Sequence, residues 1–228
     1  MFLKKYEALP DQLQNEKVKY YYDVIAAKKA TCFFKTVFDY LLALFLFIIL
    51  LPFLLIIGIL VKCTSKGPVF FYQVRVGRYL KPFKIIKFRT MVVGAEKMGA
   101  QITVGEKDPR ITGIGAFLRR FRLDELPQVI NVLKGDMSFV GTRPEVPKYV
   151  KRYQPEMLAT LLLKPGITGL ASIAFKDENA MLGEEDSPEA AYVNKILPVK
   201  MKINLEYIEK MSVLEDIKIM FKTLCCDH

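Results

Sequence analysis

The longest apolar stretch of this chain runs from Tyr40 to Val61, 22 residues without a charge. A helix embedded in a bilayer needs roughly 20 apolar residues, so the length suits a membrane segment. Pro52 stands near its middle, where a proline removes a backbone hydrogen bond and bends the helix. Lysines flank both ends of the stretch: Lys28, Lys29 and Lys35 before it, and Lys62 and Lys66 after it. Because a spanning segment usually has one flank poor in lysine and arginine, the pattern favours a re-entrant helix over a single-pass anchor with a tolerated proline.

Shorter patterns lie on either side of this segment. Residues 1–35 are polar and of mixed charge, which predicts a helical lead-in lying on the membrane surface. Val69–Val76 and Phe83–Phe88 are rich in aromatic and β-branched residues and are separated by a turn with glycine and proline, so we expect a β-hairpin. Residues 92–112 are polar and rich in glycine, which predicts a loop.

Helical periodicity marks the second half of the chain. Ile114–Phe121 and Leu126–Leu133 each carry an apolar stripe with helical spacing. Ile203–Leu224 predicts one or two amphipathic helices. Met157–Lys164 is apolar with a cationic end, which is typical of a segment lying in a membrane interface.

Charge and composition narrow the chemistry. Of the 228 residues, 52% are hydrophobic and 25% are charged, which excludes a polytopic membrane protein and a disordered chain. The only histidine, His228, is the last residue, so a Ser-His-Asp triad, a Cys-His pair and a histidine-rich zinc site are excluded. The four cysteines form no Cys-x-x-Cys motif. Residues 62–153 hold 19 Lys and Arg against 7 Asp and Glu, so we expect an anionic partner. The candidates are nucleic acid, anionic lipid and phosphorylated small molecules; no nucleic-acid-binding motif is present.

Asp124 and Glu125 are the first candidates for catalysis. Pro127 fits only the first turn of a helix, so we expect a helix to begin here with Asp124 as its N-cap. Arg119, Arg120 and Arg122 lie just upstream. An ionised carboxylate in this setting can act as a nucleophile, a general base or a Mg²⁺ ligand. An isolated Asp-Glu pair is more often a surface charge pair.

Three further segments have the residue types that grip phosphate. Lys87–Met91 places two cations, Lys87 and Arg89, after a strand, and arginine suits bidentate phosphate contacts. The turn 141–144 (GTRP) presents Arg143. The turn 165–169 (PGITG) has two glycines whose backbone amides can cradle an anion. Each segment alone is better explained as a turn or a strand end.

Taken together and in order, these segments resemble a known family. The strings are GPVFFYQVRVG at 67–77, KFRTM at 87–91, the long string from Asp108 to Gly141, TRPE at 142–145 and PGITGLAS at 165–172. They are similar to those of the bacterial sugar transferases, the monotopic polyprenol-phosphate phosphoglycosyl transferases. The resemblance covers roughly residues 35–222.

The resemblance implies a mostly helical α/β fold, with a small α/β core, amphipathic interfacial helices and a re-entrant membrane helix hairpin broken near Pro52. It divides the chain into a lead-in (1–35), the re-entrant helix (36–62) and a catalytic domain (63–228) on the cytoplasmic face of the bacterial inner membrane. The implied reaction transfers sugar 1-phosphate from a nucleotide-diphosphate sugar, usually a UDP-sugar, to undecaprenyl phosphate. Such a step initiates capsule, O-antigen or exopolysaccharide assembly.

The resemblance also implies roles for single residues. Asp124 would be the nucleophile, forming a covalent phosphosugar, and would contact Mg²⁺; Glu125 would be the base. Arg119 would hold the phosphate of the polyprenol acceptor. The nucleotide sugar and its phosphates would be bound by Arg89, Arg143, Pro144, Gly166, Thr168 and Lys176. Membrane lipids are expected partners, nucleic acid is not, and downstream glycosyltransferases or a second copy of the chain are left open.

The chain departs from the family pattern at several positions: Leu51 before Pro52, Thr142 in the turn, Ser172 and Lys176 after the PGITG string, and Asn204 near the C-terminal helix. These changes leave the sugar unassigned. Two alternatives remain from the sequence: a membrane-bound scaffold of the same fold without activity, and a single-pass anchored protein whose outer domain binds anionic polymers.

Overall fold

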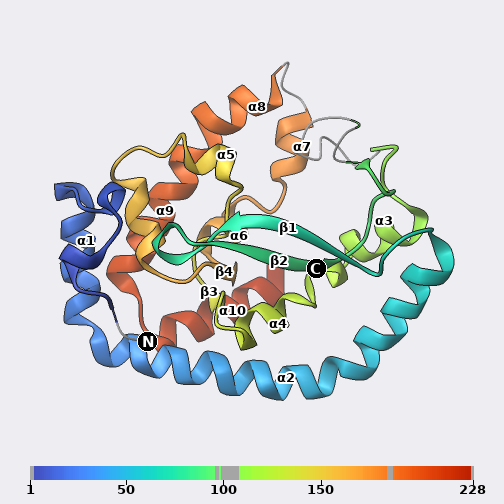
Figure 1. The fold of residues 1–228 in the computed structure, drawn as a ribbon, viewed down its shortest axis with the longest axis horizontal. Helices are drawn as coiled ribbons and strands as arrows, with labels where there is room; N and C mark the ends of the chain where they lie inside the picture. Colours follow the sequence, from blue (N-terminus) through green and yellow to red (C-terminus); the bar gives the residue numbers. More distant parts are fainter. Residues whose placement is uncertain (1–2, 96–97, 99–107, 184–186, 227–228) are drawn as a thin grey trace.

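The computed structural model describes residues 3–95, 98, 108–183 and 187–226. Most of these residues are helical, and the strands form two small sheets of two strands each. The mostly helical α/β fold with a small core, expected from the resemblance, is confirmed. Figure 1 shows the arrangement: one long helix follows one side of the molecule, and the other elements lie on the inner side of its curve.

The long helix is α2 (Lys29–Thr64), which has 36 residues and contains Pro52. It is continuous through the proline and bows, as its blue-to-cyan ribbon shows in Figure 1. A proline in a helix removes one hydrogen bond but leaves the turns on either side able to continue. The two halves therefore do not fold back on each other as a hairpin, and the break expected near Pro52 is a bend. In the part of the chain described, α2 is the one helix long and apolar enough to cross a membrane.

The N-terminal segment contains two short 3-10 turns, η1 (Tyr6–Ala8) and η2 (Asp11–Leu13), followed by α1 (Glu16–Ala27). The side-chain oxygen of Asn15 caps α1 by accepting a hydrogen bond from the Val18 N–H at 3.0 Å. Leu13, Val18 and Ile25 are buried in the main hydrophobic core. The helical character expected of this lead-in is confirmed, and three of its apolar positions pack into the protein; its place on the membrane surface stays a prediction.

The predicted hairpin is confirmed. Strand β1 (Phe70–Val76) pairs with antiparallel β2 (Pro82–Phe88), with Phe70 opposite Phe88. The connection is the short turn η3 (Arg78–Leu80). A second sheet, which the sequence did not suggest, pairs β3 (Ser138–Val140) with parallel β4 (Gly166–Thr168). Strands of three residues are too short to show a period.

Along the sequence, three helical elements follow β2 and precede β3: α3 (Gly113–Arg120), the 3-10 turn η5 (Leu123–Glu125) and α4 (Gln128–Leu133). Both helices expected in this region are confirmed. Of the expected loop 92–112, residues 96–97 and 99–107 lie outside the described residues, and a bridge joins Met91 to Ile111.

The C-terminal half consists of short helical elements and two longer helices. They are α5 (Pro147–Val150), η6 (Met157–Leu162), α6 (Leu170–Ala174), α7 (Glu178–Gly183), α8 (Pro188–Ala191), the π-helical turn η7 (Tyr192–Ile196), α9 (Leu197–Lys210) and α10 (Val213–Cys226). The membrane-interface segment expected at Met157–Lys164 is wrong: five of the six η6 residues are buried. The expectation of one or two helices over Ile203–Leu224 is met by α9 and α10, of which α9 packs into the core.

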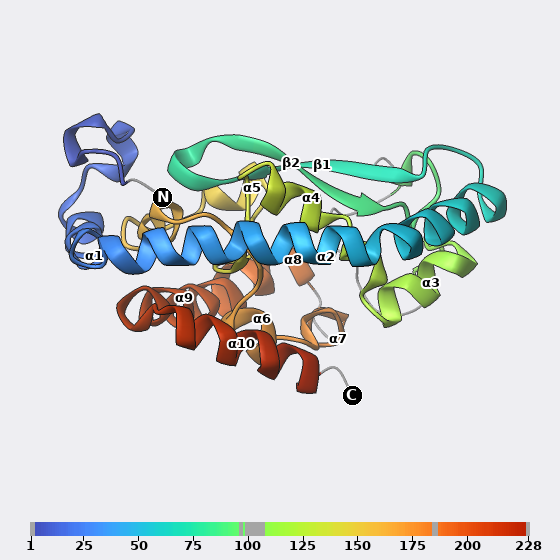
Figure 2. The same ribbon diagram turned by 90° about the horizontal axis from the view of Figure 1, so that it is seen from below.

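Apolar side chains gather on the outer side of α2. More than a dozen large ones are exposed along this helix, among them Phe45, Ile48 and Ile59, each about 60% exposed. Helix α10 adds Leu214 and Phe221, and α3 adds Phe117 and Phe121. Figure 2 views the molecule from this side, with α3 and α10 on the same flank of α2. Such a patch is far larger than soluble proteins normally expose, which indicates contact with a membrane.

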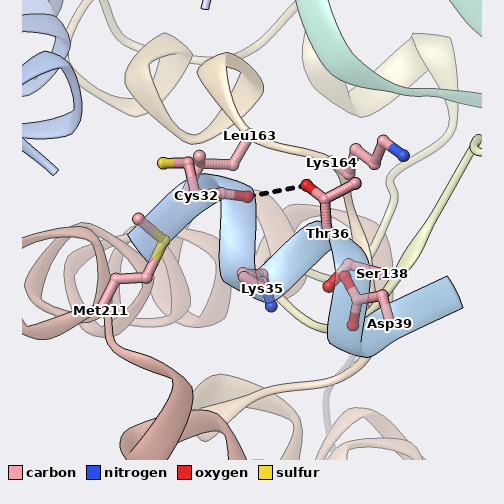
Figure 3. Close-up of a pocket in the computed structure, with 8 residues that line it drawn as sticks. All are labelled: Cys32, Lys35, Thr36, Asp39, Ser138, Leu163, Lys164 and Met211. Atoms are coloured by element: carbon pink, nitrogen blue, oxygen red, sulfur yellow. Dashed lines mark hydrogen bonds between the residues drawn. The ribbon is translucent and has the colours of Figure 1, made fainter. Parts of the chain in front are cut away.

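The inner side of α2 instead carries buried charge. Lys35 donates to an Asp216 carboxylate oxygen on α10 at 2.6 Å and to the Val140 carbonyl at the end of β3 at 2.9 Å. Tyr207 of α9 donates to the other oxygen of Asp216 at 2.5 Å. The backbone N–H of Phe139 donates to Asp39 at 3.3 Å. Figure 3 shows Lys35 and Asp39 at a small pocket beside Ser138. This network ties the membrane-facing helix to the core.

Candidate active site

Asp124 and Glu125 lie on one continuous helical path. Leu126 and Pro127 keep right-handed helical angles between η5 and α4, so the chain winds without a break from Leu123 to Leu133. Asp124 is therefore not the helix N-cap that the sequence predicts. Arg122, in the left-handed region with φ 52°, precedes η5, and Pro127 precedes α4.

Glu125 is held by two cations from other elements. Lys87, on β2, donates to its Oε1 at 2.6 Å. Arg143, in the turn after β3, donates from Nη1 to Oε2 at 3.2 Å and from Nη2 to Oε1. The hairpin, the η5 turn and the 141–144 turn thus converge on one carboxylate.

These contacts set the protonation of the cluster. Burial would raise the pKa of Glu125, but Arg143 and Lys87 together hold it well below its ordinary value. Glu125 in turn raises the pKa of Arg143. Burial lowers the pKa of Lys87, and the charge of Glu125 opposes this shift. The result is a fixed anion between two cations, which makes Glu125 a poor proton acceptor.

Asp124 has a different environment. It is 8% exposed, and in the described part of the chain no hydrogen bond reaches its carboxylate. Burial raises its pKa, while Lys87 is the strongest of the nearby charges that lower it, followed by Arg119 and Arg143. An unbonded carboxylate among three cations can attack an electrophile or bind a metal, because no competing donor must first be displaced.

Arg119 joins the cluster from α3. Its Nε donates to the Thr90 hydroxyl at 2.9 Å, and the Thr90 carbonyl accepts a hydrogen bond from the Thr112 N–H at 3.0 Å. Burial lowers the pKa of Arg119, and the charge of Asp124 opposes this shift. Thr90 therefore orients a further guanidinium near the dyad.

Arg89, expected to bind the nucleotide sugar, lies elsewhere. Its Nη2 donates to the Ser65 carbonyl at 2.7 Å and to the Ser65 hydroxyl at 2.6 Å, just past the end of α2. A guanidinium there satisfies the last carbonyl groups of a helix and interacts well with its dipole. The structure places this arginine at the end of the membrane helix and not beside the dyad.

Two of the other predicted phosphate-binding residues, Gly166 and Pro144, lie at the Arg143 turn. Gly166 donates its N–H to the Thr142 carbonyl at 2.9 Å, and a Cβ at Gly166 would lie 2.1 Å from the Gly141 nitrogen. The Pro144 carbonyl accepts a hydrogen bond from Arg75 at 3.0 Å. These contacts from β4 and β1 hold the turn that presents Arg143.

Thr168 and Lys176 are less closely connected to the dyad. The hydroxyl of Thr168 lies 2.7 Å from that of Thr223 on α10, so this side chain joins β4 to α10. Lys176 is exposed after α6. Neither residue makes a contact with Asp124 or Glu125 that the structure records.

Sequence reasoning missed the roles of Lys87 and Thr90. Both belong to the KFRTM string, but attention fell on Arg89 as the phosphate ligand. Alternation along β2 offered no clear signal, because both Ile85 and Ile86 are buried and the period of two does not distinguish Lys87 from the exposed Lys84.

A metal site built by the protein alone is not seen in the residues that the structure describes, where no group of three candidate ligands occurs. Mg²⁺ commonly takes one or two carboxylates and completes its shell with water and substrate phosphates. Asp124 offers such a carboxylate, and Glu125 is already occupied by Lys87 and Arg143. The residues present fit a Mg²⁺ ion that arrives with a phosphorylated substrate.

Comparison with known proteins shows which family this chain belongs to. A family model described as "Bacterial sugar transferase" matches residues 30–226. The chain belongs to this family. The UDP-glucose:undecaprenyl-phosphate glucose-1-phosphate transferase of Escherichia coli (strain K12) is 42% identical over 190 residues, covering 82% of this chain and 38% of that protein. The undecaprenyl-phosphate galactose phosphotransferase of Salmonella typhimurium (strain LT2) is 34% identical over 212 residues, covering 86% of this chain and 41% of that protein.

A shorter family member matches over nearly its whole length. The exopolysaccharide production protein PSS of Rhizobium leguminosarum bv. phaseoli is 35% identical over 204 residues, which make up 83% of this chain and 92% of that protein. The chain thus spans about two fifths of the first two relatives and most of the third.

Proposed function

We propose that this chain is a phosphoglycosyl transferase that moves a sugar 1-phosphate from a nucleotide-diphosphate sugar, a UDP-sugar, to undecaprenyl phosphate. The products are undecaprenyl-diphosphate sugar and the nucleoside monophosphate. The carrying observation is the cluster in which Asp124 lies near Lys87, Arg119 and Arg143, with no hydrogen bond to its carboxylate from the described residues. The name of the Escherichia coli relative gives both substrates, and that of the Salmonella typhimurium relative gives undecaprenyl phosphate. Initiation of capsule, O-antigen or exopolysaccharide assembly follows from the same reaction.

The reaction proceeds in two displacements. An oxygen of the Asp124 carboxylate attacks the sugar-bearing phosphorus, a phosphosugar–aspartate bond forms, and the phosphoanhydride bond to the nucleoside monophosphate breaks. An oxygen of undecaprenyl phosphate then attacks the same phosphorus and displaces Asp124 as a free carboxylate. Neither step needs a histidine, because phosphoryl transfer depends mainly on positioning and charge neutralisation.

The cations divide this work. Arg143 and Lys87 face the dyad from the turn and from β2, where they can neutralise the donor's phosphates. Arg119, oriented by Thr90, can hold the phosphate of the acceptor. Glu125 keeps Lys87 and Arg143 in place. Its depressed pKa supports this positioning role in preference to the general base expected from the sequence.

Mg²⁺ belongs to the proposal as a cofactor held by Asp124 together with the donor's diphosphate. When bound, it would neutralise charge on the phosphates and draw electron density from the phosphorus under attack. Because the described residues supply so few ligands, we expect weak Mg²⁺ binding without donor and tight binding with it.

The membrane face follows from α2. Its outer side is apolar and the rest of the protein lies on its inner side, which suits a bowed helix that dips into one leaflet (Figure 1). We place this leaflet on the cytoplasmic side of the bacterial inner membrane, where nucleotide sugars are made. Cys63 near the end of α2 is exposed, whereas Cys32 is buried. In a variant that keeps only Cys63, a membrane-impermeant thiol reagent should label permeabilised cells and spare intact ones; labelling of intact cells would contradict this topology.

The activity is tested by release of nucleoside monophosphate from a panel of UDP-sugars, with and without undecaprenyl phosphate. We expect one or a few sugars to give release that continues only with the acceptor. Asp124→Asn should abolish it, and Lys151→Met, at an exposed lysine, is the control. If no UDP-sugar gives release, the alternative of a membrane-bound scaffold of the same fold gains support. The intact dyad and its cations argue against that alternative.

A further inference from the structure

Gln128, the first residue of α4, is fully buried, yet neither polar atom of its side-chain amide has a hydrogen-bond partner among the residues that the structure describes. In the described part of the chain, Arg89 also has buried nitrogens without a partner, but its guanidinium keeps its hydrogen bonds to Ser65. Leaving a buried amide unsatisfied is unfavourable, and apolar groups of the same shape avoid the loss. A partner is therefore expected in another state of the site.

The position of Gln128 limits which partner this can be. The chain is helical from Leu123 onward, and 3-10 turns place residues i and i+3 on one face, so Gln128 follows Glu125 on the same side. Asn131, a further turn along, uses its amide on β2, accepting from the Ile86 N–H at 3.0 Å and donating to the Lys84 carbonyl at 2.8 Å. Gln128 thus lies between a satisfied amide and the Glu125 carboxylate.

Glu125 has a bond that substrate binding would disturb. Lys87 bonds its Oε1, whereas the recorded partner of its Oε2 is Nη1 of Arg143 at 3.2 Å. The Arg143 side chain is 34% exposed, against 18% for Lys87, so it is the cation that solvent and ligands reach more readily. A nucleotide diphosphate offers a guanidinium two or more anionic oxygens in bidentate geometry. If Arg143 turns to the diphosphate, Oε2 of a buried carboxylate loses its donor.

We propose that Gln128 is a positioning residue of the donor-loaded site: when Arg143 turns from Glu125 to a phosphate of the nucleotide diphosphate, the side-chain amide of Gln128 donates to Glu125 in its place. The amide is unpartnered in the ligand-free protein because Arg143 occupies its acceptor. The exchange keeps Glu125, and through it Lys87, in position while Arg143 binds the donor. This inference rests on the proposed nucleotide-diphosphate donor.

The exchange can be tested without substrate, by a double-mutant cycle on thermal stability. In the wild type, Gln128→Leu removes an unsatisfied amide and should leave the melting temperature unchanged or raise it. In an Arg143→Met background, Glu125 has lost its guanidinium and Gln128 should already be its partner. There, Gln128→Leu should lower the melting temperature by about 2–4 °C. The same shift in both backgrounds would overturn the proposal, whatever the enzyme's activity.

Donor binding gives a second readout. With a UDP-sugar that the wild type turns over, Gln128→Leu should weaken donor binding about 10-fold, because moving Arg143 now leaves Glu125 short of a donor. Gln154→Leu, at an exposed glutamine, should bind like the wild type. Unchanged donor affinity in Gln128→Leu would contradict the exchange. If the wild type binds no UDP-sugar, the proposed function fails, and the stability cycle still decides the role of Gln128.

Discussion

Lys87 offers the sharpest test of the cluster, because its ammonium lies beside both carboxylates of the dyad. Lys87→Met keeps much of the apolar stem and removes the charge. The pair it forms with Glu125 is short, 2.6 Å, and its side chains are 18% and 15% exposed. Breaking a buried ion pair costs about 3–5 kcal/mol. Arg143 remains on Glu125, so we expect the low end of this range, a loss of about 3 kcal/mol in the free energy of unfolding.

The same substitution should move the pH dependence of donor cleavage. Burial raises the pKa of Asp124, and Lys87 is the strongest charge acting against that rise. Without Lys87 the pKa rises further, so the acid limb of the rate profile, where protonation removes the nucleophile, shifts to higher pH. Unfolding by denaturant and a pH profile of nucleoside monophosphate release measure the two effects.

A matched control lies on the same strand. Lys84 is exposed, and Lys84→Met should change stability by less than about 0.5 kcal/mol and leave the pH profile unmoved. Equal stability losses for the two variants would refute the account of a buried Lys87–Glu125 pair. An unmoved acid limb in Lys87→Met would refute the assignment of Asp124 as the group that titrates.

Three further predictions concern stability. Lys35→Met breaks the buried pair with Asp216 and should destabilise the protein by about 3–5 kcal/mol. Lys29→Met, at an exposed lysine in the first turn of the same helix, should not destabilise it. A small loss of stability for both variants would show that the network does not anchor α2. Gly166→Ala forces a Cβ to within 2.1 Å of the Gly141 backbone nitrogen and should cost about 1–3 kcal/mol or more by thermal melting. Since the folded pKa of Glu125 is depressed, its ionisation stabilises the fold above its unfolded pKa of about 4.3, and this contribution is lost as the pH falls through the folded value. The stability advantage of wild type over Glu125→Gln should therefore shrink toward pH 3; a constant difference would contradict the shift.

Much of the fold was predictable from periodicity. The hairpin, α3, α4 and the long apolar helix follow from patterns spanning six or more residues. Other features depend on contacts distant in sequence. The three-residue strands β3 and β4 pair across more than twenty intervening residues, and η6 looks like an interfacial segment until its neighbours bury it. Likewise, the N-terminal segment is polar overall, and the spacing of Leu13, Val18 and Ile25 did not show that these three residues pack into the core.

The candidate site was predictable in its residue types and less so in its pairings. The motifs correctly drew attention to Asp124, Glu125, Arg119 and Arg143, which the structure brings together. They could not show that Arg89 turns to the end of α2 while Lys87, two residues earlier, reaches Glu125. Residues two apart along a strand share a face, so alternation does not separate these two cations. Their partners differ because η5 packs beside β2 at Lys87, whereas the end of α2 reaches Arg89, and local sequence does not encode these tertiary contacts.

The central claim is that Asp124 carries the phosphosugar, and intact-mass measurement of the protein tests it most directly. The detergent-solubilised protein is incubated with Mg²⁺ and its UDP-sugar in the absence of undecaprenyl phosphate. It is then denatured, and its intact mass is measured. We predict an added mass equal to one sugar phosphate on the wild type, mapped to Asp124, matched by one equivalent of nucleoside monophosphate and discharged by undecaprenyl phosphate. An Asp124→Asn variant that still turns over both substrates at the wild-type rate would contradict the claim.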